Sequence, residues 1–206
     1  MWYKKEEVFM AHEHSFASPG PAGLAALAVA CFGFAAVFLG KVGLGGLPLL
    51  AAWLVGGGVV QLSTALIELK DHNITGGNVF LFFSAFFMFA AALSVFAKFM
   101  LLANDMKPLS YVEGWCWMAG AGFLTVVTPA YFKSPKTMGV LVVMVDIVLW
   151  AIVFLDLGIA DPKIWKPVVA YLLIAAGWIG IYMSGAIVCN TVYGKTIFPI
   201  PGPFIK

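Results

Sequence analysis

Six apolar stretches divide this chain, and each is long enough to cross a lipid bilayer. Lipid offers no hydrogen-bond partner to backbone N–H and C=O groups, so a spanning segment needs about 20 mostly apolar residues in a helix that pairs its own backbone. The stretches lie near residues 22–40, 47–66, 77–101, 111–131, 138–157 and 167–193. The sequence therefore predicts an all-α integral membrane protein with six transmembrane helices, in which residues 1–206 form a single membrane domain.

Composition favours the same class of protein. Charged residues make up 11% of the chain and hydrophobic residues 62%, whereas a soluble domain carries roughly 25% charged residues. The net charge of +2 is small and scattered, which excludes nucleic acid as a partner because that needs a clustered basic face. Cys31, Cys116 and Cys189 lie in apolar stretches, where we expect small packing residues rather than disulfides or metal ligands.

Lysine placement predicts the orientation in the membrane, because short cytoplasmic loops carry an excess of positive charge. With six helices, the two termini and the second and fourth loops share one side and carry seven lysines, against four in the opposite loops. Both termini are therefore expected in the cytoplasm, with residues 1–17 and the tail 194–206 on that side of the cell membrane. Lys98, near the far end of the third stretch, is expected to extend its charge to the outer interface.

The N-terminal segment alternates aromatic and apolar residues with lysine and glutamate, which predicts a short interfacial helix, with disorder as the alternative. Its lysines lie too far from the first apolar stretch for a cleavable signal. His12 and His14 lack a third ligand, so no metal site is predicted. The chain contains no phosphate-binding loop, zinc-binding H-E-x-x-H or G-x-S-x-G motif, so we expect neither catalytic residues nor a cofactor.

Polar residues within the apolar stretches indicate where function lies, because burying a polar side chain in lipid costs free energy unless the side chain faces protein or water. Four stand out: Gln61, Glu68, Asn78 and Asp146. Gln61 and Glu68 lie two turns apart on roughly the same helix face, although Glu68 could equally be a solvated loop acid. Asp146 has apolar neighbours on both sides and must be buried, paired or hydrated; a structural hydrogen bond between helices is the alternative to a transport role.

Two helix starts share one side of the membrane. Ser18-Pro19-Gly20-Pro21 predicts a turn, a cap and a first-turn proline, and the segment from Asn73 to Asn78 predicts a second capped start. Helix N-termini carry unpaired N–H groups and a positive dipole end, so this pair would attract a small carboxylate. Capping alone would explain the same residues.

These segments resemble the acetate uptake transporters, whose bacterial members are succinate-acetate permeases. Residues 18–24 are similar to the N-P-A-P-L-G-L signature of that family, and residues 57–61 to its G-G-x-x-Q element. Further similarities are Glu68, Asn73, Gly76, Phe80, Gly177, Tyr182, Asn190 and residues 194–199. The departures are Ser18 in place of asparagine, Lys195 in place of arginine and Phe83 where tyrosine is common.

The resemblance implies a six-helix protomer with its own pore, assembled as a ring, most simply a hexamer, that passes acetate and related small carboxylates, succinate included. It also implies a narrow apolar part of the pore at Leu27, Phe83 and Val145, which ordinary core packing would explain as well. The polar candidates for the pore are Ser18, Gln61, Glu68, Asn73, Asn78, Asp146, Tyr182 and Asn190. A channel for neutral solutes such as urea or amides, and a membrane scaffold without transport, are the alternatives.

Overall fold

The computed structural model describes residues 16–205, and that part of the chain is helical without a β-strand. The elements are α1 (Gly20–Phe38), the 3-10 turn η1 (Leu44–Gly46), α2 (Leu47–Lys70), α3 (Ile74–Phe83), the π-helix η2 (Ser84–Ala90), α4 (Ala91–Ala103), α5 (Tyr111–Tyr131), α6 (Lys136–Asp156) and α7 (Pro162–Tyr193). The prediction of an all-α protein is confirmed. The expected interfacial helix, with His12 and His14, lies outside the described residues.

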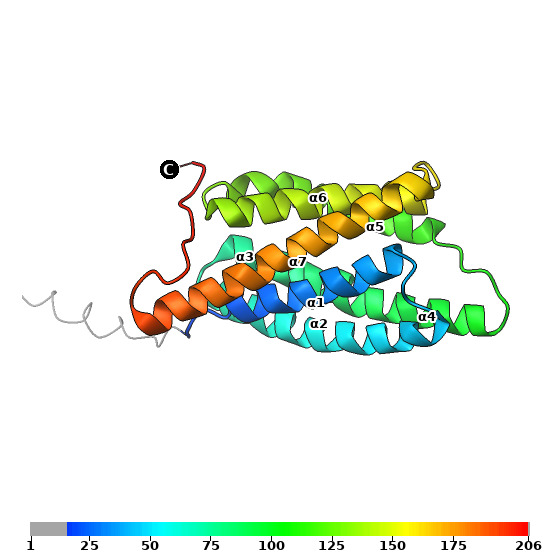
Figure 1. Ribbon diagram of the computed structural model, residues 1–206, viewed down its shortest axis with the longest axis horizontal. Helices are drawn as coiled ribbons and strands as arrows, with labels where there is room; N and C mark the ends of the chain where they lie inside the picture. Colours follow the sequence, from blue (N-terminus) through cyan, green and yellow to red (C-terminus); the bar gives the residue numbers. More distant parts are fainter. Residues whose placement is uncertain (1–15, 206) are drawn as a thin grey trace, which may run out of the picture.

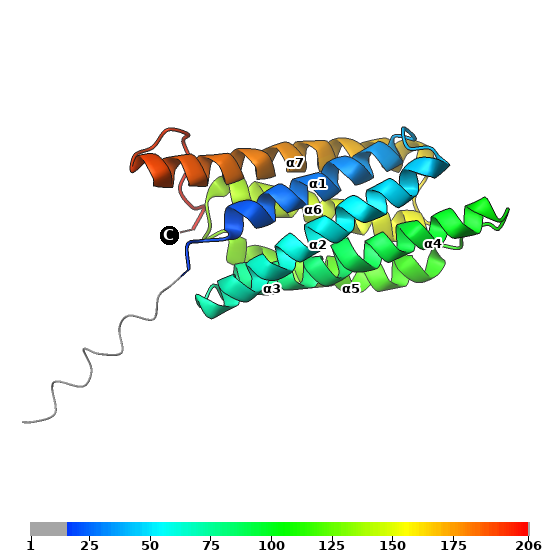
Figure 2. The same ribbon diagram turned by 90° about the horizontal axis from the view of Figure 1, so that it is seen from below.

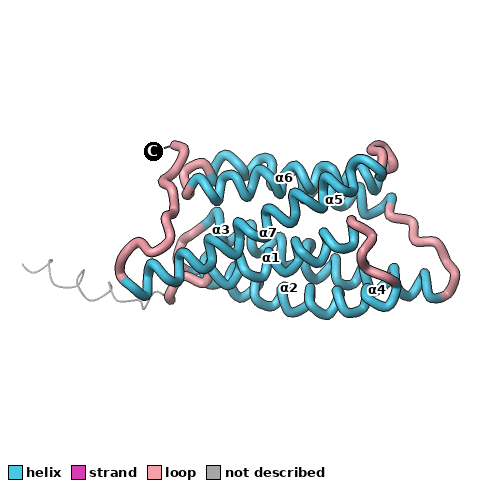
Figure 3. The backbone as a smooth tube through the Cα atoms, in the orientation of Figure 1, coloured by secondary structure: helices cyan, strands magenta, loops and turns pink. Residues whose placement is uncertain are grey.

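The helices run along the length of an elongated bundle (Figures 1 and 3). α3, η2 and α4 follow one another without a break from Ile74 to Ala103 and form one long rod. Contacts join α1 to α2, α2 to α3, α3 to α5, α5 to α6, α6 to α7 and α7 back to α1. These contacts close a ring of helices, and Figure 2 shows α1 lying between α7 and α2.

Five of these stretches are long and apolar enough to cross a membrane: Gly20–Phe38, Leu44–Lys70, Ile74–Ala103, Lys136–Asp156 and Pro162–Tyr193. The remaining helix, α5, is 21 residues long. It contains Glu113 in its first turn and Pro129 near its end, together with threonines and several glycines that lower its mean hydropathy. Length and composition therefore indicate five spans in the described part of the chain, and α5 owes its place to packing against α6.

Local sequence explains where the helices begin and end. Asn73 caps α3, because its side chain accepts a hydrogen bond from the N–H of Gly76 at 3.1 Å. Gly194 ends α7 in a left-handed conformation (φ 61°) that glycine adopts without strain. The prediction for α1 is half wrong: a proline does occupy its first turn, but Pro19 is the N-cap residue and no side chain caps that end.

Glycines allow close contacts between the helices. A Cβ atom at Gly23 would lie 2.7 Å from the Phe80 ring, and one at Gly180 would lie 3.2 Å from the backbone oxygen of Leu24. Close approach of this kind joins membrane helices, which lack a hydrophobic driving force between them. Gly56 and Gly185, by contrast, face open space.

Candidate functional site

A cavity of about 200 Å³ lies inside the ring of helices, at the end of the bundle where α1, α3 and α6 begin. One water needs only about 10–15 Å³ of such space, so the cavity can hold a small organic molecule. Its lining comes from six helices and the segments beside them: Ser18, Gly20, Leu24, Leu27, Gln61, Glu68, Asn73, Thr75, Gly76, Val79, Phe80, Phe83, Leu124, Tyr131, Ser134, Met138, Leu141, Val142, Val145 and Ile187.

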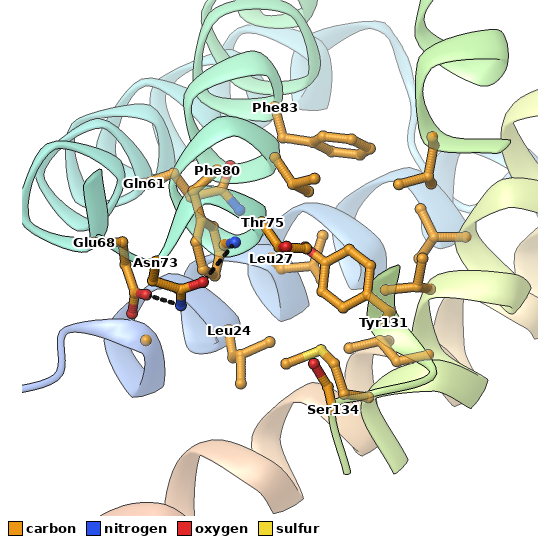
Figure 4. Close-up of a pocket in the computed structure, with 18 of the residues that line it drawn as sticks. Leu24, Leu27, Gln61, Glu68, Asn73, Thr75, Phe80, Phe83, Tyr131 and Ser134 are labelled. Atoms are coloured by element: carbon orange, nitrogen blue, oxygen red, sulfur yellow. Dashed lines mark hydrogen bonds between the residues drawn. The ribbon is translucent and has the colours of Figure 1, made fainter. Parts of the chain in front are cut away.

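The lining is polar at the mouth and mostly apolar inside (Figure 4). Ser18, Asn73 and Ser134 lie outside the helices, at the open end. Phe83, Val145 and Gln61 each lie nine residues along their helices from that end, which corresponds to a depth of about 13 Å. The deep part of the cavity is therefore a wall of aliphatic and aromatic side chains with one amide among them.

Leu27, Phe83 and Val145 all line this cavity, although they come from α1, α3 and α6. Each side chain is almost fully buried, and Phe83 also packs against the rings of Phe82 and Phe87. The three residues that the resemblance assigned to a constriction thus line one cavity. Whether they form its narrowest part stays a prediction.

Glu68 occupies the space in front of two helix starts. Its carboxylate accepts a hydrogen bond from the side chain of Asn73, and only 7% of the residue is exposed. A Cβ atom added at Gly20 would lie 3.3 Å from Oε1 of Glu68, and one added at Gly76 would lie 3.2 Å from Oε2. The positive N-terminal ends of α1 and α3, which the sequence predicted would attract a ligand's carboxylate, therefore already face a carboxylate of the chain.

Gln61 is the polar group deepest in the cavity and is 1% exposed. Its Nε2 donates to the backbone oxygen of Gly23 over a long 3.5 Å. Its Oε1 has no hydrogen-bond partner among the described residues. Buried polar atoms are normally paired, so this oxygen is an acceptor without a donor.

The other polar candidates lie outside the cavity lining. Asn78 is exposed and donates to the backbone oxygen of Ile74 in its own helix. Asp146 is half-buried and accepts a hydrogen bond from the hydroxyl of Thr125 at 2.9 Å, which joins α6 to α5. This hydrogen bond agrees with the structural role among the two that the sequence left open for Asp146, and the choice between them stays a prediction.

Tyr182 and Asn190 hold the C-terminal tail. The hydroxyl of Tyr182 donates to the backbone oxygen of Pro199 at 2.7 Å. The side chain of Asn190 donates to the oxygen of Phe198 and accepts from the N–H groups of Ile197 and Phe198. Further along, Phe204 packs on Phe132, so the tail connects the end of α7 to the turn between α5 and α6 (Figure 1).

Sequence reasoning missed three polar residues of the cavity, Thr75, Tyr131 and Ser134. Tyr131 is the last residue of α5 and Ser134 follows it, so both lie at the same end of the bundle as Ser18 and Asn73. The alternation of helix direction could have identified this shared end. The sequence holds no signal for which side chains turn inward there.

Lys98 forms an ion pair that the sequence did not predict. Its Nζ atom lies 2.5 Å from a carboxylate oxygen of Glu113, whose other oxygen accepts a hydrogen bond from Ser94. The lysine therefore joins α4 to the first turn of α5, and its expected place at the outer interface stays a prediction. The ion pair also neutralises the charge of Glu113, which lowers the free-energy cost of placing α5 in the membrane.

Comparison with known proteins adds independent findings. The model of the GPR1/FUN34/yaaH family matches residues 4–201. Among solved structures, the chain is similar to the structure of the bacterial acetate channel SatP, with a TM-score of 0.76 and 19% sequence identity over 90% of this chain and 99% of that one. At this identity the similarity shows a shared fold alone. No match was found among curated proteins.

Proposed function

The chain belongs to the GPR1/FUN34/yaaH family, and from that premise we propose that it is a membrane channel or transporter for acetate and related small carboxylates. The resemblance to acetate uptake transporters noted in the sequence is confirmed by this membership. The observation that carries the proposal is the cavity inside the ring of helices, with its polar mouth and apolar interior.

The chemistry of the cavity suits a small carboxylic compound. Such a molecule has one short apolar end and one polar end, so it can make hydrogen bonds at the mouth and pass an apolar wall that hydrated ions do not cross. Leu27, Phe83 and Val145 supply that wall. SatP, which shares the fold, is an acetate channel.

The finer features of this function belong to the same proposal. α5 serves as a sixth span, because it closes the ring of helices and its Glu113 is paired with Lys98. Each protomer contains its own pore, with the constriction at the apolar wall. The protomers form a ring, most simply a hexamer, in the cell membrane, and both termini lie in the cytoplasm.

Uptake of labelled acetate into liposomes that contain the purified protein tests the proposal. We expect uptake above that of protein-free liposomes, and we expect Val145→Phe to reduce it by filling the cavity. Val143→Phe is the matched control, because Val143 lies on the same helix but is 37% exposed and outside the lining. Uptake no faster than in protein-free liposomes, with the protein folded, contradicts the proposal.

A channel for neutral solutes is the second candidate. It is favoured by one observation: the part of the chain that the structure describes places no lysine, arginine or histidine in the cavity lining. Urea and acetamide fluxes measured in the same liposomes separate the two candidates. Fluxes of these amides that exceed the acetate flux would favour the second.

A further inference from the structure

The long rod of α3, η2 and α4 changes its helical geometry directly after Phe83. α3 ends at Phe83, and the next seven residues, Ser84–Ala90, form the π-helix η2. A π-helix pairs each backbone N–H with the carbonyl five residues earlier, and such turns are rare and are found frequently at functional sites. Because Phe83 lines the cavity, the change in geometry lies beside a side chain of the proposed constriction.

Ser84, the first residue of η2, joins this point of the rod to α2. It is 1% exposed, and its hydroxyl donates to the backbone oxygen of Gly58 at 3.0 Å. A serine or threonine hydroxyl inside a helix often donates to the carbonyl four residues earlier in the same helix. The hydroxyls that do so in this structure include those of Ser63, Thr125, Thr128 and Thr191. Ser84 differs from them because it bonds to a neighbouring helix.

Two glycines allow the backbone of α2 to lie against the same segment. A Cβ atom at Gly57 would lie 3.0 Å from the sulfur of Met88, and one at Gly58 would lie 2.8 Å from the Phe89 ring. α2 contacts α3, η2 and α4, and Figure 2 shows it running alongside the rod. The close approach lets the Ser84 hydroxyl reach α2. These contacts fix the rotation of the rod about its own axis at η2.

That rotation determines where Phe83 points. Neighbouring residues of a helix point about 100° apart, so Ser84 on the side of α2 leaves Phe83 directed into the ring of helices. A second support comes from Phe87 of η2, whose ring centroid lies 5.5 Å from that of Phe83. The ring of Phe87 is itself held by Phe34 of α1 and Trp117 of α5. Phe83 is therefore positioned by the backbone on one side and by an aromatic cluster behind it.

Building on the proposed function, we infer that Ser84 is a positioning residue for size selectivity, because its hydrogen bond to α2 holds the Phe83 ring in the cavity. Ser84 lies outside the described lining and acts through Phe83. π-helical pairing is rare, so it depends on contacts with neighbouring helices to persist. Without the bond, the backbone at the start of η2 is free to turn, and the Phe83 ring no longer keeps one position. The opening beside Leu27 and Val145 then becomes wider on average.

Competitive uptake of labelled acetate and butyrate by liposomes that contain the intact protein tests the inference. Ser84→Ala removes the hydroxyl, and it leaves no carbonyl unpaired because Gly58 lies inside α2, where its oxygen belongs to the helical hydrogen bonds. We expect the protein-dependent ratio of butyrate to acetate uptake to rise about two- to tenfold, the range that corresponds to one net hydrogen bond. Protein-free liposomes give the background, because these acids also cross lipid by themselves.

Thr128→Val is the matched control. Thr128 is a buried residue outside the cavity lining, and its hydroxyl donates to the oxygen of Leu124 in its own helix at 2.8 Å. Valine removes this hydroxyl at similar size. We expect the ratio of butyrate to acetate uptake to stay at the value of the unmodified protein, even where the unfolding temperature falls.

Dependence on Phe83 separates positioning from a general loosening of the bundle. In Phe83→Ala the ring is absent, so the additional change Ser84→Ala should leave the uptake ratio at the value of Phe83→Ala alone. An equal rise of the ratio in both backgrounds shows that Ser84 acts independently of Phe83 and overturns the inference.

The remaining outcomes are also decisive. An unchanged ratio in folded Ser84→Ala overturns the inference but leaves the proposed function standing, whereas no protein-dependent uptake of either acid by the unmodified protein overturns both. If Ser84→Ala does not fold, Gly58→Ala is the second variant. Its new methyl group would lie 2.8 Å from the Phe89 ring and must push η2 away from α2, so the same rise is expected. An unchanged ratio in folded Gly58→Ala then overturns the inference.

Discussion

The side chain of Phe83 illustrates how one position can combine packing with selectivity. It is 4% exposed, lines the cavity and contacts two other aromatic rings, whereas Phe86, three residues later, is 53% exposed. Both belong to the same aromatic run, so the sequence alone does not separate them. Burial inside the ring of helices gives Phe83 its contact with the substrate path that we propose.

Replacing Phe83 should therefore change which acids pass. We expect Phe83→Ala to enlarge the cavity and to raise the uptake of propionate and butyrate relative to acetate, at a cost in stability of about 3–5 kcal/mol. Phe86→Ala is the matched control and should leave relative uptake unchanged. The measurement is competitive uptake in liposomes, and unchanged selectivity of folded Phe83→Ala would place Phe83 outside the path.

Asp146 leads to the opposite expectation. Its carboxylate accepts from Thr125, whose hydroxyl in turn accepts from the Trp150 indole at 2.9 Å, and none of these groups lines the cavity. Asn at this position keeps an acceptor oxygen for Thr125 but does not titrate. We expect Asp146→Asn to leave the pH dependence of acetate uptake unaltered, and a shifted pH profile would show that Asp146 takes part in transport.

At the scale of elements, the start of α3 joins three helices through one residue. Asn73 caps α3 and donates to Glu68 of α2, which lies against the first turn of α1. Loss of a cap costs about 1 kcal/mol, and a buried carboxylate without its donor costs more. This small cluster fixes the shape of the cavity mouth.

Thermal unfolding in detergent tests this role. Asn73→Ala removes both the cap of α3 and the donor to Glu68, which together should lower the free energy of unfolding by about 2 kcal/mol or more. We therefore expect a clearly lower unfolding temperature. Asn78→Ala, in the same helix but exposed and bonded only to its own helix, should change it little. Equal effects of the two substitutions would contradict the assignment.

The C-terminal tail is a second element whose position depends on few contacts. Asn190 makes three hydrogen bonds to residues 197–198, and its neighbour Thr191 bonds only to its own helix. We expect Asn190→Ala to increase hydrogen exchange at Ile197 and Phe198, and Thr191→Ala to leave it unchanged. If the amides of Ile197 and Phe198 exchange no faster in Asn190→Ala, then Tyr182 and the contacts of Phe204 are enough to hold the tail in place.

At the scale of the whole molecule, the ring of helices leaves large apolar side chains on its outer surface, among them Trp53 and Trp178. Lipid or neighbouring protomers would cover such a surface. From the family resemblance we expect six protomers in a ring. Native mass spectrometry of the detergent-purified protein should give six times the protomer mass of 22.1 kDa, and a monomer at that stage would contradict the expectation.

The fold class followed from the sequence, because hydrophobicity along the chain is a local property and lipid imposes helical hydrogen bonding. The cap at Asn73 was also predictable, since a cap depends on residues three positions apart. Motif similarity brought Leu27, Phe83, Val145, Gln61 and Glu68 to attention without showing that they share one cavity.

Only the tertiary structure decided which polar residues turn inward. Asn78 and Asp146 have sequence surroundings as suggestive as those of Gln61, yet the rotation of each helix about its axis directs them away from the cavity. That rotation is set by contacts between helices distant in the sequence, such as the close approach of Gly180 to Leu24 and of Gly23 to Phe80. A membrane helix carries apolar side chains on all sides, so the hydrophobic periodicity that reveals the buried face of a soluble helix is weak here. Packing between the helices alone determines which face of each helix points inward.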